Sequence, residues 1–126
     1  MGLMLDTSVA IHLRDGDDAI RARVLQLDEA PVLSIITRIE LEGGLVGPDG
    51  ATRKRRFEEM LAVLVVLPFD EADADVYRHI LSALGFSRRK TMDRLIASQA
   101  IATRATLVTL NGSDFRDIPD LKLLEW

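Results

Sequence analysis

The chain has 126 residues, a net charge of −4 and no cysteine. This length suits a single domain, residues 1–126, that buries roughly two thirds of its unfolded surface. An apolar content of 48% with 29% charged residues excludes a disordered chain. The lack of cysteine excludes disulfides and thiolate metal sites and fits a reducing cytoplasm. His12 and His79 are the only histidines, too few for a histidine-rich zinc site, and their helical contexts favour structural or exposed positions.

Signals that direct a chain to a membrane are also missing. No apolar run reaches the roughly 18 residues of a membrane span, and no basic segment precedes a long apolar stretch at the N-terminus. We therefore expect a cytoplasmic protein without a signal peptide. The negative net charge argues against a protein that coats nucleic acid by charge alone, but it allows an enzyme that meets phosphates at one local site.

The predicted elements alternate between strands and helices. Residues 3–5 form an apolar run typical of a buried strand, and Asp6-Thr7-Ser8 then provides capping residues for a helix. Helical spacing predicts further helices over residues 19–27, 36–46, 51–62, 71–84 and 92–103. Short apolar runs predict strands over residues 32–34, 63–67 and 106–110, with a short fifth strand over residues 121–124. Glycine or proline ends several of these elements, at Gly47-Pro48, Pro68 and Gly85.

Because the strands are apolar throughout, the pattern predicts an α/β fold. We expect a three-layer α/β/α domain whose central, mostly parallel sheet of four to five strands is covered on both faces. Sites in such sheets lie at the carboxyl ends of the strands. Asp6 directly follows the first strand, and Asp114 follows the fourth after a short loop, so both are expected at this edge.

Four acidic residues lie at the edges of elements: Asp6, Glu40, Asp93 and Asp114. Each of them, taken alone, has a structural explanation. Asp6 could cap the first helix, and Asp114 could cap a turn beside Asn111. Asp93 could stabilise a helix N-terminus, and Glu40 could be a solvated acid within a helix.

Helical geometry adds an argument for Asp93. Ile96, Ala97 and Ala100 stand three, four and seven residues later on the same helix face. The carboxylate therefore lies in line with a buried stripe and needs a partner there, of which a metal ion would be one.

Helical geometry does not separate Glu40 from Glu42. One apolar stripe of the predicted helix consists of Ile36, Ile39, Gly43 and Val46. The two glutamates flank this stripe about equally. Leu41 and Leu45 make the opposite face apolar as well, so the helix is either deeply buried or meets another chain. We favour a homodimer contact.

The acids together predict a metal-dependent nuclease. Three or four carboxylates at close range repel one another unless a cation neutralises them. Mg²⁺ or Mn²⁺, held by one or two carboxylates plus waters, activates a water molecule and stabilises charge on a phosphoryl oxygen. This chemistry needs no catalytic histidine.

Five motifs span almost the whole chain. They are Met4-Leu5-Asp6-Thr7-Ser8, Glu40-Leu41-x-x-Gly44, Asp93-x-Leu95-Ile96-Ala97-x-x-Ala100, Ala105-Thr106-Leu107-Val108-Thr109-x-Asn111-x-x-Asp114-Phe115, and Ile118-Pro119-x-Leu121 through Trp126. In this order and spacing the chain resembles the PIN domain, and specifically the VapC-type toxins of bacterial toxin–antitoxin pairs.

The resemblance implies a PIN-like domain with Mg²⁺- or Mn²⁺-dependent endoribonuclease activity, acting on tRNA or another structured RNA. It assigns Asp6, Glu40, Asp93 and Asp114 to the catalytic metal site, and so selects Glu40 over Glu42. Asp6 and Asp93 are the expected direct ligands. Asp114 is expected to assist directly or through water, and Glu40 to orient the nucleophilic water.

The resemblance also implies supporting residues and partners. Thr7 and Asn111 match supporting positions of the family. VapC-type proteins usually form homodimers and are held inactive by a cognate VapB-type antitoxin that fills the site. The toxin–antitoxin complex commonly represses its own operon, so operator DNA is an expected partner through the antitoxin.

One segment departs from the family pattern. Where many relatives carry a glycine before the third acid, this chain has Ser87-Arg88-Arg89-Lys90-Thr91, which we interpret as variation in the substrate or antitoxin surface. We favour Arg88, Arg89 and Lys90 for RNA phosphates because they directly precede Asp93. This run and the second basic run, Arg53-Lys54-Arg55-Arg56, could equally be solvated surface.

Other function classes fit parts of the sequence. An aspartate-nucleophile phosphatase or dehalogenase needs a second Asp two residues after the first or a Thr four residues after it, where this chain has Ser8 and Ala10. A non-catalytic PIN-like module that binds a protein fits the two-faced apolar helix, but a pure scaffold gains nothing from clustered acids. No residue reads a 2′-hydroxyl in the sequence, so RNA rather than DNA rests on the resemblance alone.

Overall fold

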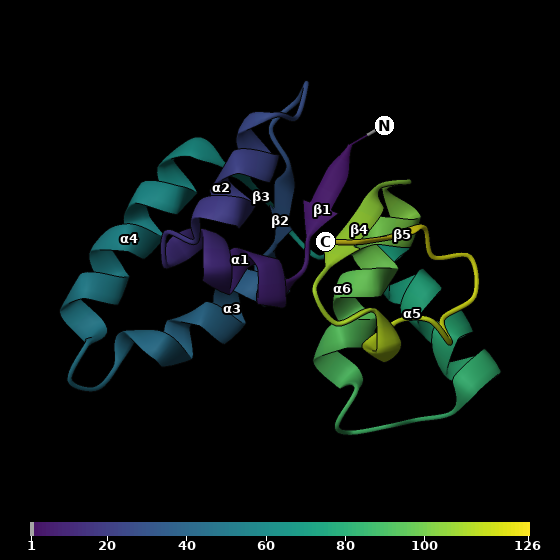
Figure 1. Cartoon of the computed structure of the whole chain (residues 1–126). Helices are drawn as coiled ribbons and strands as arrows, with labels where there is room; N and C mark the ends of the chain where they lie inside the picture. Colours follow the sequence, from purple (N-terminus) through teal and green to yellow (C-terminus); the bar gives the residue numbers. More distant parts are fainter. Residues whose placement is uncertain (1) are drawn as a thin grey trace.

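The computed structural model describes residues 2–126, so the predicted domain boundary at residue 1 lies outside the described residues (Figure 1). The described residues form five strands: β1 (Leu3–Leu5), β2 (Val32–Ser34), β3 (Val65–Leu67), β4 (Thr106–Thr109) and β5 (Leu123–Glu125). Within the same residues there are six α-helices: α1 (Thr7–Arg14), α2 (Asp18–Leu25), α3 (Ile35–Glu42), α4 (Gly50–Val63), α5 (Glu71–Leu84) and α6 (Thr91–Ala102). Two short 3₁₀ helices are η1 (Gly43–Leu45) and η2 (Gly112–Asp114).

The strands form one parallel sheet in the order β3-β2-β1-β4-β5. In the centre, Leu5 of β1 is in register with Leu33 of β2 and with Val108 of β4. Parallel neighbours require crossover connections, which the helices supply. The carboxyl ends of all five strands therefore lie at the same edge of the sheet, as predicted.

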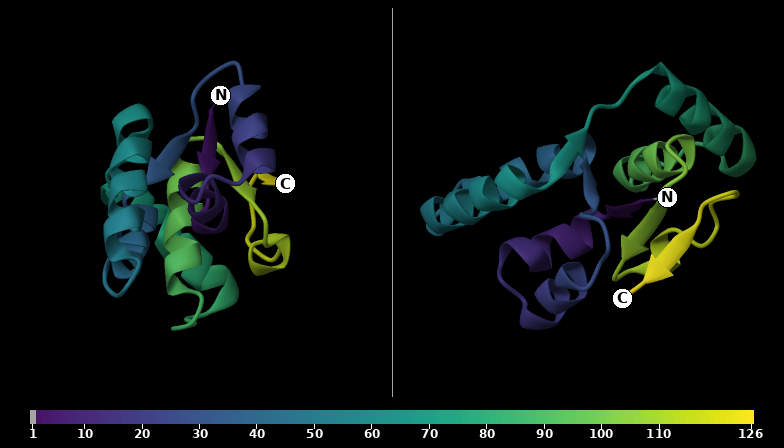
Figure 2. Two further views of the ribbon diagram at one scale, coloured as in Figure 1. Left: turned by 60° about the vertical axis from the view of Figure 1, so that its left-hand side comes forward. Right: turned by 90° about the horizontal axis from the view of Figure 1, so that it is seen from above.

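Helices cover both faces because successive strand residues point to opposite sides. Met4 and Leu107 pack with α5 and α6 on one face. Leu5, Leu33 and Val108 pack with α1, α2 and α4 on the other face. Figures 1 and 2 show this separation, with α5 and α6 on one side of the sheet and α1 and α2 on the other. The predicted three-layer α/β/α architecture is confirmed.

Side-chain caps begin several helices where the sequence predicts them. Asp6 accepts a hydrogen bond from the Ser8 amide at the start of α1, and Ser34 accepts one from the Ile36 amide at the start of α3. Such caps each stabilise a helix by about 1 kcal/mol. Gly85 has a φ of 76°, a left-handed conformation that favours glycine, and it ends α5 as predicted.

The helix predicted over residues 36–46 is shorter than expected. It begins at Ile35 and ends at Glu42, and the chain continues as η1. The consecutive glycines Gly43 and Gly44 explain the change, because glycine destabilises an α-helix by about 1 kcal/mol relative to alanine. A tighter 3₁₀ turn then takes over.

The apolar stripe of this helix is only partly buried. The buried residues of α3 are Ile36, Thr37 and Leu41, whereas Ile39 and Val46 are 54% and 76% exposed. Burial follows the two packed cores on either side of the sheet, with Ile36 in one and Leu41 in the other. The face with Ile39 is left uncovered within this chain.

Two predicted strands are shifted. The strand expected over residues 63–67 begins only at Val65, because α4 runs through Val63. The fifth strand begins at Leu123 rather than Leu121 and pairs with β4. No helix within residues 2–126 is both long and apolar enough to cross a membrane.

Candidate metal centre

The four predicted acids come from four different elements that meet at the carboxyl edge of the sheet. Asp6 follows β1, Glu40 lies in α3, Asp93 lies in the first turn of α6, and Asp114 ends η2 after β4. Figure 1 shows the ends of β1 and β4 at this edge, together with the starts of α1 and α6.

Asp6 is the most deeply buried of the four acids, with 4% of its surface exposed. Its Oδ1 accepts a hydrogen bond of 2.7 Å from the Ser8 amide. Its Oδ2 accepts hydrogen bonds from the hydroxyls of Ser8 and Thr109. Burial raises the pKa of Asp6, while the hydrogen bonds from Thr109 and Ser8 oppose that rise. The protein thus holds this carboxylate in a fixed orientation at the end of β1.

Asp93 is half-buried, and the charges of the other acids influence its pKa. Burial raises its pKa most, the negative charges of Asp6, Asp114 and Glu40 raise it further, and the resulting pKa is about 6. Lys90 acts in the opposite direction. Because Coulomb interactions weaken with distance, the four carboxylates lie close enough to repel one another.

The structure separates Glu40 from Glu42. Glu40 accepts a 2.7 Å hydrogen bond from the hydroxyl of Thr7, which directly follows Asp6 in the chain. The Thr7 hydroxyl is also 3.0 Å from that of Thr37. Glu42 instead pairs with Arg38 on the exposed surface, at 3.7 Å. Glu40 therefore joins the other acids and Glu42 does not.

Asp114 and Asn111 lie at the exposed rim of the site. Asp114 is in the single turn of η2, where its amide donates to the carbonyl of Asn111 at 3.0 Å. The Asn111 amide donates to the Thr109 hydroxyl at 2.9 Å. This chain of bonds connects the loop after β4 to the hydroxyl that holds Asp6.

The donor set fits a hard divalent cation, although the ligands are not gathered into a compact group. Within residues 2–126, no three His, Asp or Glu side chains are close enough to form a ready metal-binding group. The charged donors of the site are all carboxylate oxygens, and burial together with the charges of the other acids raises the pKa of Asp93. Oxygen donors of this kind suit Mg²⁺, which uses one or two carboxylates and keeps several waters.

The basic residues beside the site differ in their surroundings. Lys90 pairs with Asp117 at 3.6 Å and is half-buried, whereas Arg88 and Arg89 are exposed. In the other basic run, Arg53 and Arg56 donate to the backbone carbonyls of Gly44 and Asp15. Those two arginines stabilise the fold, while Arg88 and Arg89 remain available at the surface beside Asp93.

Both histidines are exposed. Each ring contacts a backbone carbonyl four residues earlier, His12 that of Ser8 and His79 that of Asp75. These contacts agree with the structural or exposed positions predicted for them.

The sequence did not identify the hydroxyls of Thr109 and Thr37 as parts of the site. Thr109 and Thr37 are fully buried, and the Ser8 hydroxyl also accepts a 3.1 Å bond from the Leu110 amide. A signal exists for Thr109, which is the polar last residue of a strand whose two central residues, Leu107 and Val108, are apolar. Its contact with Asp6 joins residues 103 positions apart, which a motif search does not reveal.

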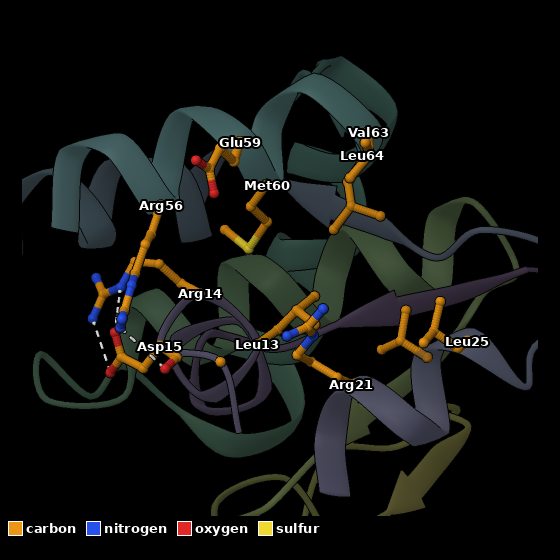
Figure 3. Close-up of a pocket in the computed structure, with 12 residues that line it drawn as sticks. Leu13, Arg14, Asp15, Arg21, Leu25, Arg56, Glu59, Met60, Val63 and Leu64 are labelled. Atoms are coloured by element: carbon orange, nitrogen blue, oxygen red, sulfur yellow. Dashed lines mark hydrogen bonds and ion pairs between the residues drawn. The ribbon is translucent and has the colours of Figure 1, made fainter. Parts of the chain in front are cut away.

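A separate groove of about 530 Å³ lies between α4 and the α1–α2 pair (Figure 3). The buried side chains of Met60 in α4 and of Leu64 directly after it line the groove. Leu25, 80% exposed, and Val63 add apolar surface. None of the four predicted site acids lines this groove, so it is a second surface of the molecule.

The sequence agrees with a known family over most of its length. The PIN domain model matches residues 3–121. The chain belongs to the PIN-domain family. It is 32% identical to the Ribonuclease VapC of Rickettsia bellii over 134 aligned positions, which cover 98% of this chain and 96% of that relative.

Solved structures of PIN-domain toxin–antitoxin complexes share the fold. VapBC2 from Rickettsia felis, bound to a DNA fragment from its promoter, has a TM-score of 0.89 and 27% sequence identity. The match covers 100% of this chain and 99% of that one. DNA-bound VapBC from Salmonella typhimurium has a TM-score of 0.88 and 26% identity, covering 100% and 98% of the two chains.

Proposed function

We propose that this PIN-domain protein is a Mg²⁺- or Mn²⁺-dependent endoribonuclease that acts as the toxin of a toxin–antitoxin pair. The observation that carries the proposal is the convergence of acids from four elements. Burial raises the pKa of Asp93 to about 6, together with the negative charges of Asp6, Asp114 and Glu40. Isolated capping residues would not repel one another in this way. The curated relatives named Ribonuclease VapC support RNA as the substrate.

Asp6 and Asp93 would hold the divalent cation, with Asp114 assisting from the rim. The bound cation would lower the pKa of a coordinated water and neutralise charge on a phosphoryl oxygen. The hydroxyls of Thr109 and Ser8 orient the Asp6 carboxylate by direct hydrogen bonds. Thr7 donates a hydrogen bond to Glu40, and Glu40 would accept a hydrogen bond from the attacking water.

RNA cleavage with variants of the acids tests the enzyme proposal. Purified protein is incubated with total RNA and with tRNA in Mn²⁺ or Mg²⁺, with EDTA as the control. We expect cleavage by wild type and only background with Asp6→Asn or Asp93→Asn. At position 6, asparagine is chosen over alanine because it keeps an oxygen that accepts the hydrogen bond from the Ser8 amide. Loss of this helix cap would cost about 1 kcal/mol. Glu42→Gln, which alters the neighbouring acid outside the site, should cleave like wild type.

Absence of cleavage by folded, antitoxin-free protein over a broad RNA panel would contradict the enzyme proposal. A Mn²⁺ titration of thermal stability would then separate the two remaining cases. A rise in Tm with wild type, absent in Asp93→Asn, would show that the acids bind a metal ion but serve another function. No change in either protein would favour the non-catalytic PIN-like binding module.

The groove beside α4 is our candidate for the surface that receives a VapB-type antitoxin. The solved relatives are complexes of toxin with antitoxin, which supports such a partner. The groove has an apolar floor at Met60 and Leu64 and charged residues at its rim, including Arg21 and Glu59. An amphipathic helix of a partner would complement this pattern. Regulation of operator DNA through the antitoxin, and a cytoplasmic location, stay predictions.

Substitutions at the exposed part of the groove test the antitoxin proposal. Leu25→Asp and Val63→Asp place charge on apolar contact surface, and both side chains are exposed, so the fold should persist. We expect each to weaken binding of the tagged cognate antitoxin by at least about tenfold in a pull-down titration, as for central interface residues. Val65→Asp, on an exposed residue outside the groove, is the control. Equal binding by all three variants would contradict the groove assignment.

A further inference from the structure

The loop between α5 and α6 carries an aromatic side chain that the fold does not use. The chain has six aromatic residues, all within the described part. Two are buried and three are half-buried, but Phe86 is 74% exposed. A phenylalanine left in water forgoes the roughly 1.5–3 kcal/mol that burial would contribute. This side chain therefore suits a contact made outside the folded chain.

Hydrogen bonds fix the loop to the start of α6, where Asp93 lies. On one side of Phe86, the Gly85 carbonyl accepts a 2.8 Å bond from the buried guanidinium of Arg94. On the other side, the Ser87 carbonyl accepts a 2.9 Å bond from the Thr91 hydroxyl. Both neighbours of Phe86 are thus held by residues within two positions of Asp93. Figure 1 shows this loop at the same edge of the molecule as the start of α6.

The surroundings of Phe86 carry positive charge. Arg88 and Arg89 follow it in the loop and are exposed, and neither takes part in an ion pair within the described residues. An aromatic ring next to exposed arginines is the combination that binds single-stranded nucleic acid, because the ring stacks on a base while the guanidiniums contact phosphates. An apolar protein partner would leave the arginines without anionic partners.

We propose that Phe86 is a stacking platform for an unpaired base of the RNA, with Arg88 and Arg89 contacting the adjacent phosphates. This proposal rests on the ribonuclease function proposed above. It restricts the substrate class to RNA that is single-stranded beside the cleavage site, such as a loop, because a base paired within a helix cannot expose its face to the ring.

Direct binding of a short single-stranded RNA of mixed sequence tests the platform without relying on catalysis. Affinities are measured in EDTA, so that the RNA stays intact, for wild type, Phe86→Ala, Phe86→Leu and Phe86→Tyr. We expect Phe86→Ala and Phe86→Leu to weaken binding by about 5- to 150-fold, the range for one base–aromatic stack. Phe86→Tyr should bind within about twofold of wild type. Binding of the same RNA annealed into a duplex should change less than threefold on any of these substitutions.

A spectroscopic readout separates stacking from general apolar contact. In Phe86→Trp, the new indole should lose fluorescence when the single strand binds, after subtraction of the signal from Trp126 in wild type. Phe86→Leu is the decisive comparison, since leucine keeps an apolar side chain but has no aromatic face. Wild-type affinity in Phe86→Leu, or no fluorescence change in Phe86→Trp, would overturn the platform.

The outcomes also separate this proposal from the ribonuclease proposal. If wild type cleaves RNA but Phe86→Leu binds and cleaves equally well, the platform is wrong and the ribonuclease stands. If no RNA is cleaved in Mn²⁺ but the single strand binds in a Phe86-dependent manner, the platform stands and the ribonuclease is wrong. If wild type neither binds nor cleaves RNA, both are wrong.

Discussion

At the scale of single residues, Asp93 links the chemistry of the site to stability. Its pKa lies at about 6 in the folded chain, against an ordinary value of 3.8. Between these two values the folded chain holds a proton that the unfolded chain has released. The free energy of unfolding of the metal-free protein therefore falls as pH rises through this window, and the loss is complete above about pH 6.

Asp93→Asn is expected to stabilise the metal-free protein at neutral pH. The amide removes a charge that burial and three neighbouring acids disfavour, so Tm in EDTA should exceed that of wild type by a few degrees near pH 7. The difference should shrink as pH falls toward 4, where wild type is protonated as well. Thermal unfolding in EDTA across this range checks the prediction, with Asp75→Asn on the exposed surface of α5 as control. A lower Tm for Asp93→Asn at pH 7 would contradict it.

The site residues differ in how far local sequence determines their role. Asp6 was predictable because it ends an apolar strand and begins a helix with capping residues. In the sequence, only the family resemblance selects Glu40 over Glu42, because both glutamates flank the apolar stripe of the helix about equally. Their different partners, Thr7 and Arg38, become visible only in three dimensions. The contact of Thr109 with Asp6 depends on the pairing of β1 with β4, which no local pattern contains.

At the scale of elements, the loop before α6 is our proposed contact with RNA phosphates. We expect Arg88→Ala combined with Arg89→Ala to weaken RNA binding and to flatten its dependence on salt. Each phosphate contact contributes about 0.7 to the slope of log affinity against log salt for single strands, so losing two contacts should reduce the slope by about 1.4. Binding titrations at several salt concentrations measure this slope.

Lys54→Ala combined with Arg55→Ala provides the matched control for this loop. The control pair also removes two positive charges from the exposed surface, but from α4. Arg53 and Arg56 are avoided because their bonds to backbone carbonyls would add a structural effect. Equal slopes for the loop variant and wild type would contradict the assignment of Arg88 and Arg89 to phosphate contacts.

The elements themselves were largely predictable, and the errors have a common cause. Helix α5 begins and ends as predicted because Asp70 and Asp73 form a reciprocal capping box and Gly85 ends it. The buried face of α3 could not be identified from the sequence because hydrophobic periodicity records which residues are apolar, not which of them the sheet covers. Ile36 and Leu41 face the two cores, while Ile39, equally apolar, faces away.

At the scale of the whole molecule, charge and shape divide the surface into distinct regions. The acids come from elements at the carboxyl edge of the sheet, while Arg88 and Arg89 are exposed in the loop that precedes α6, in a chain whose net charge is −4. An RNA approaching this protein is therefore attracted locally, by the loop and by any bound cation, and not by the overall field. The groove between α4 and the α1–α2 pair is a separate region, because none of the four acids lines it.

The uncovered face of α3 leads to a prediction about assembly. Ile39 and Val46 are exposed apolar residues on α3 and just after η1, and the homodimer predicted from the sequence would cover them. We expect wild type to sediment as a dimer of twice 14.0 kDa and Ile39→Asp to shift the equilibrium toward the monomer. A buried, unpaired carboxylate at an interface costs several kcal/mol, so the Ile39→Asp protein should dimerise only at a much higher protein concentration.

Sedimentation velocity over a concentration series measures this shift. Val65→Asp, at an exposed apolar residue of β3, tests whether any added surface charge has the same effect. Because Ile39 directly precedes Glu40 in α3, a dimer through this face would place the acids near the partner subunit. Dissociation should then also reduce RNA cleavage, whereas Val65→Asp should leave both assembly and cleavage unchanged. A monomeric wild type, or a dimer that tolerates Ile39→Asp, would contradict the assignment of this face.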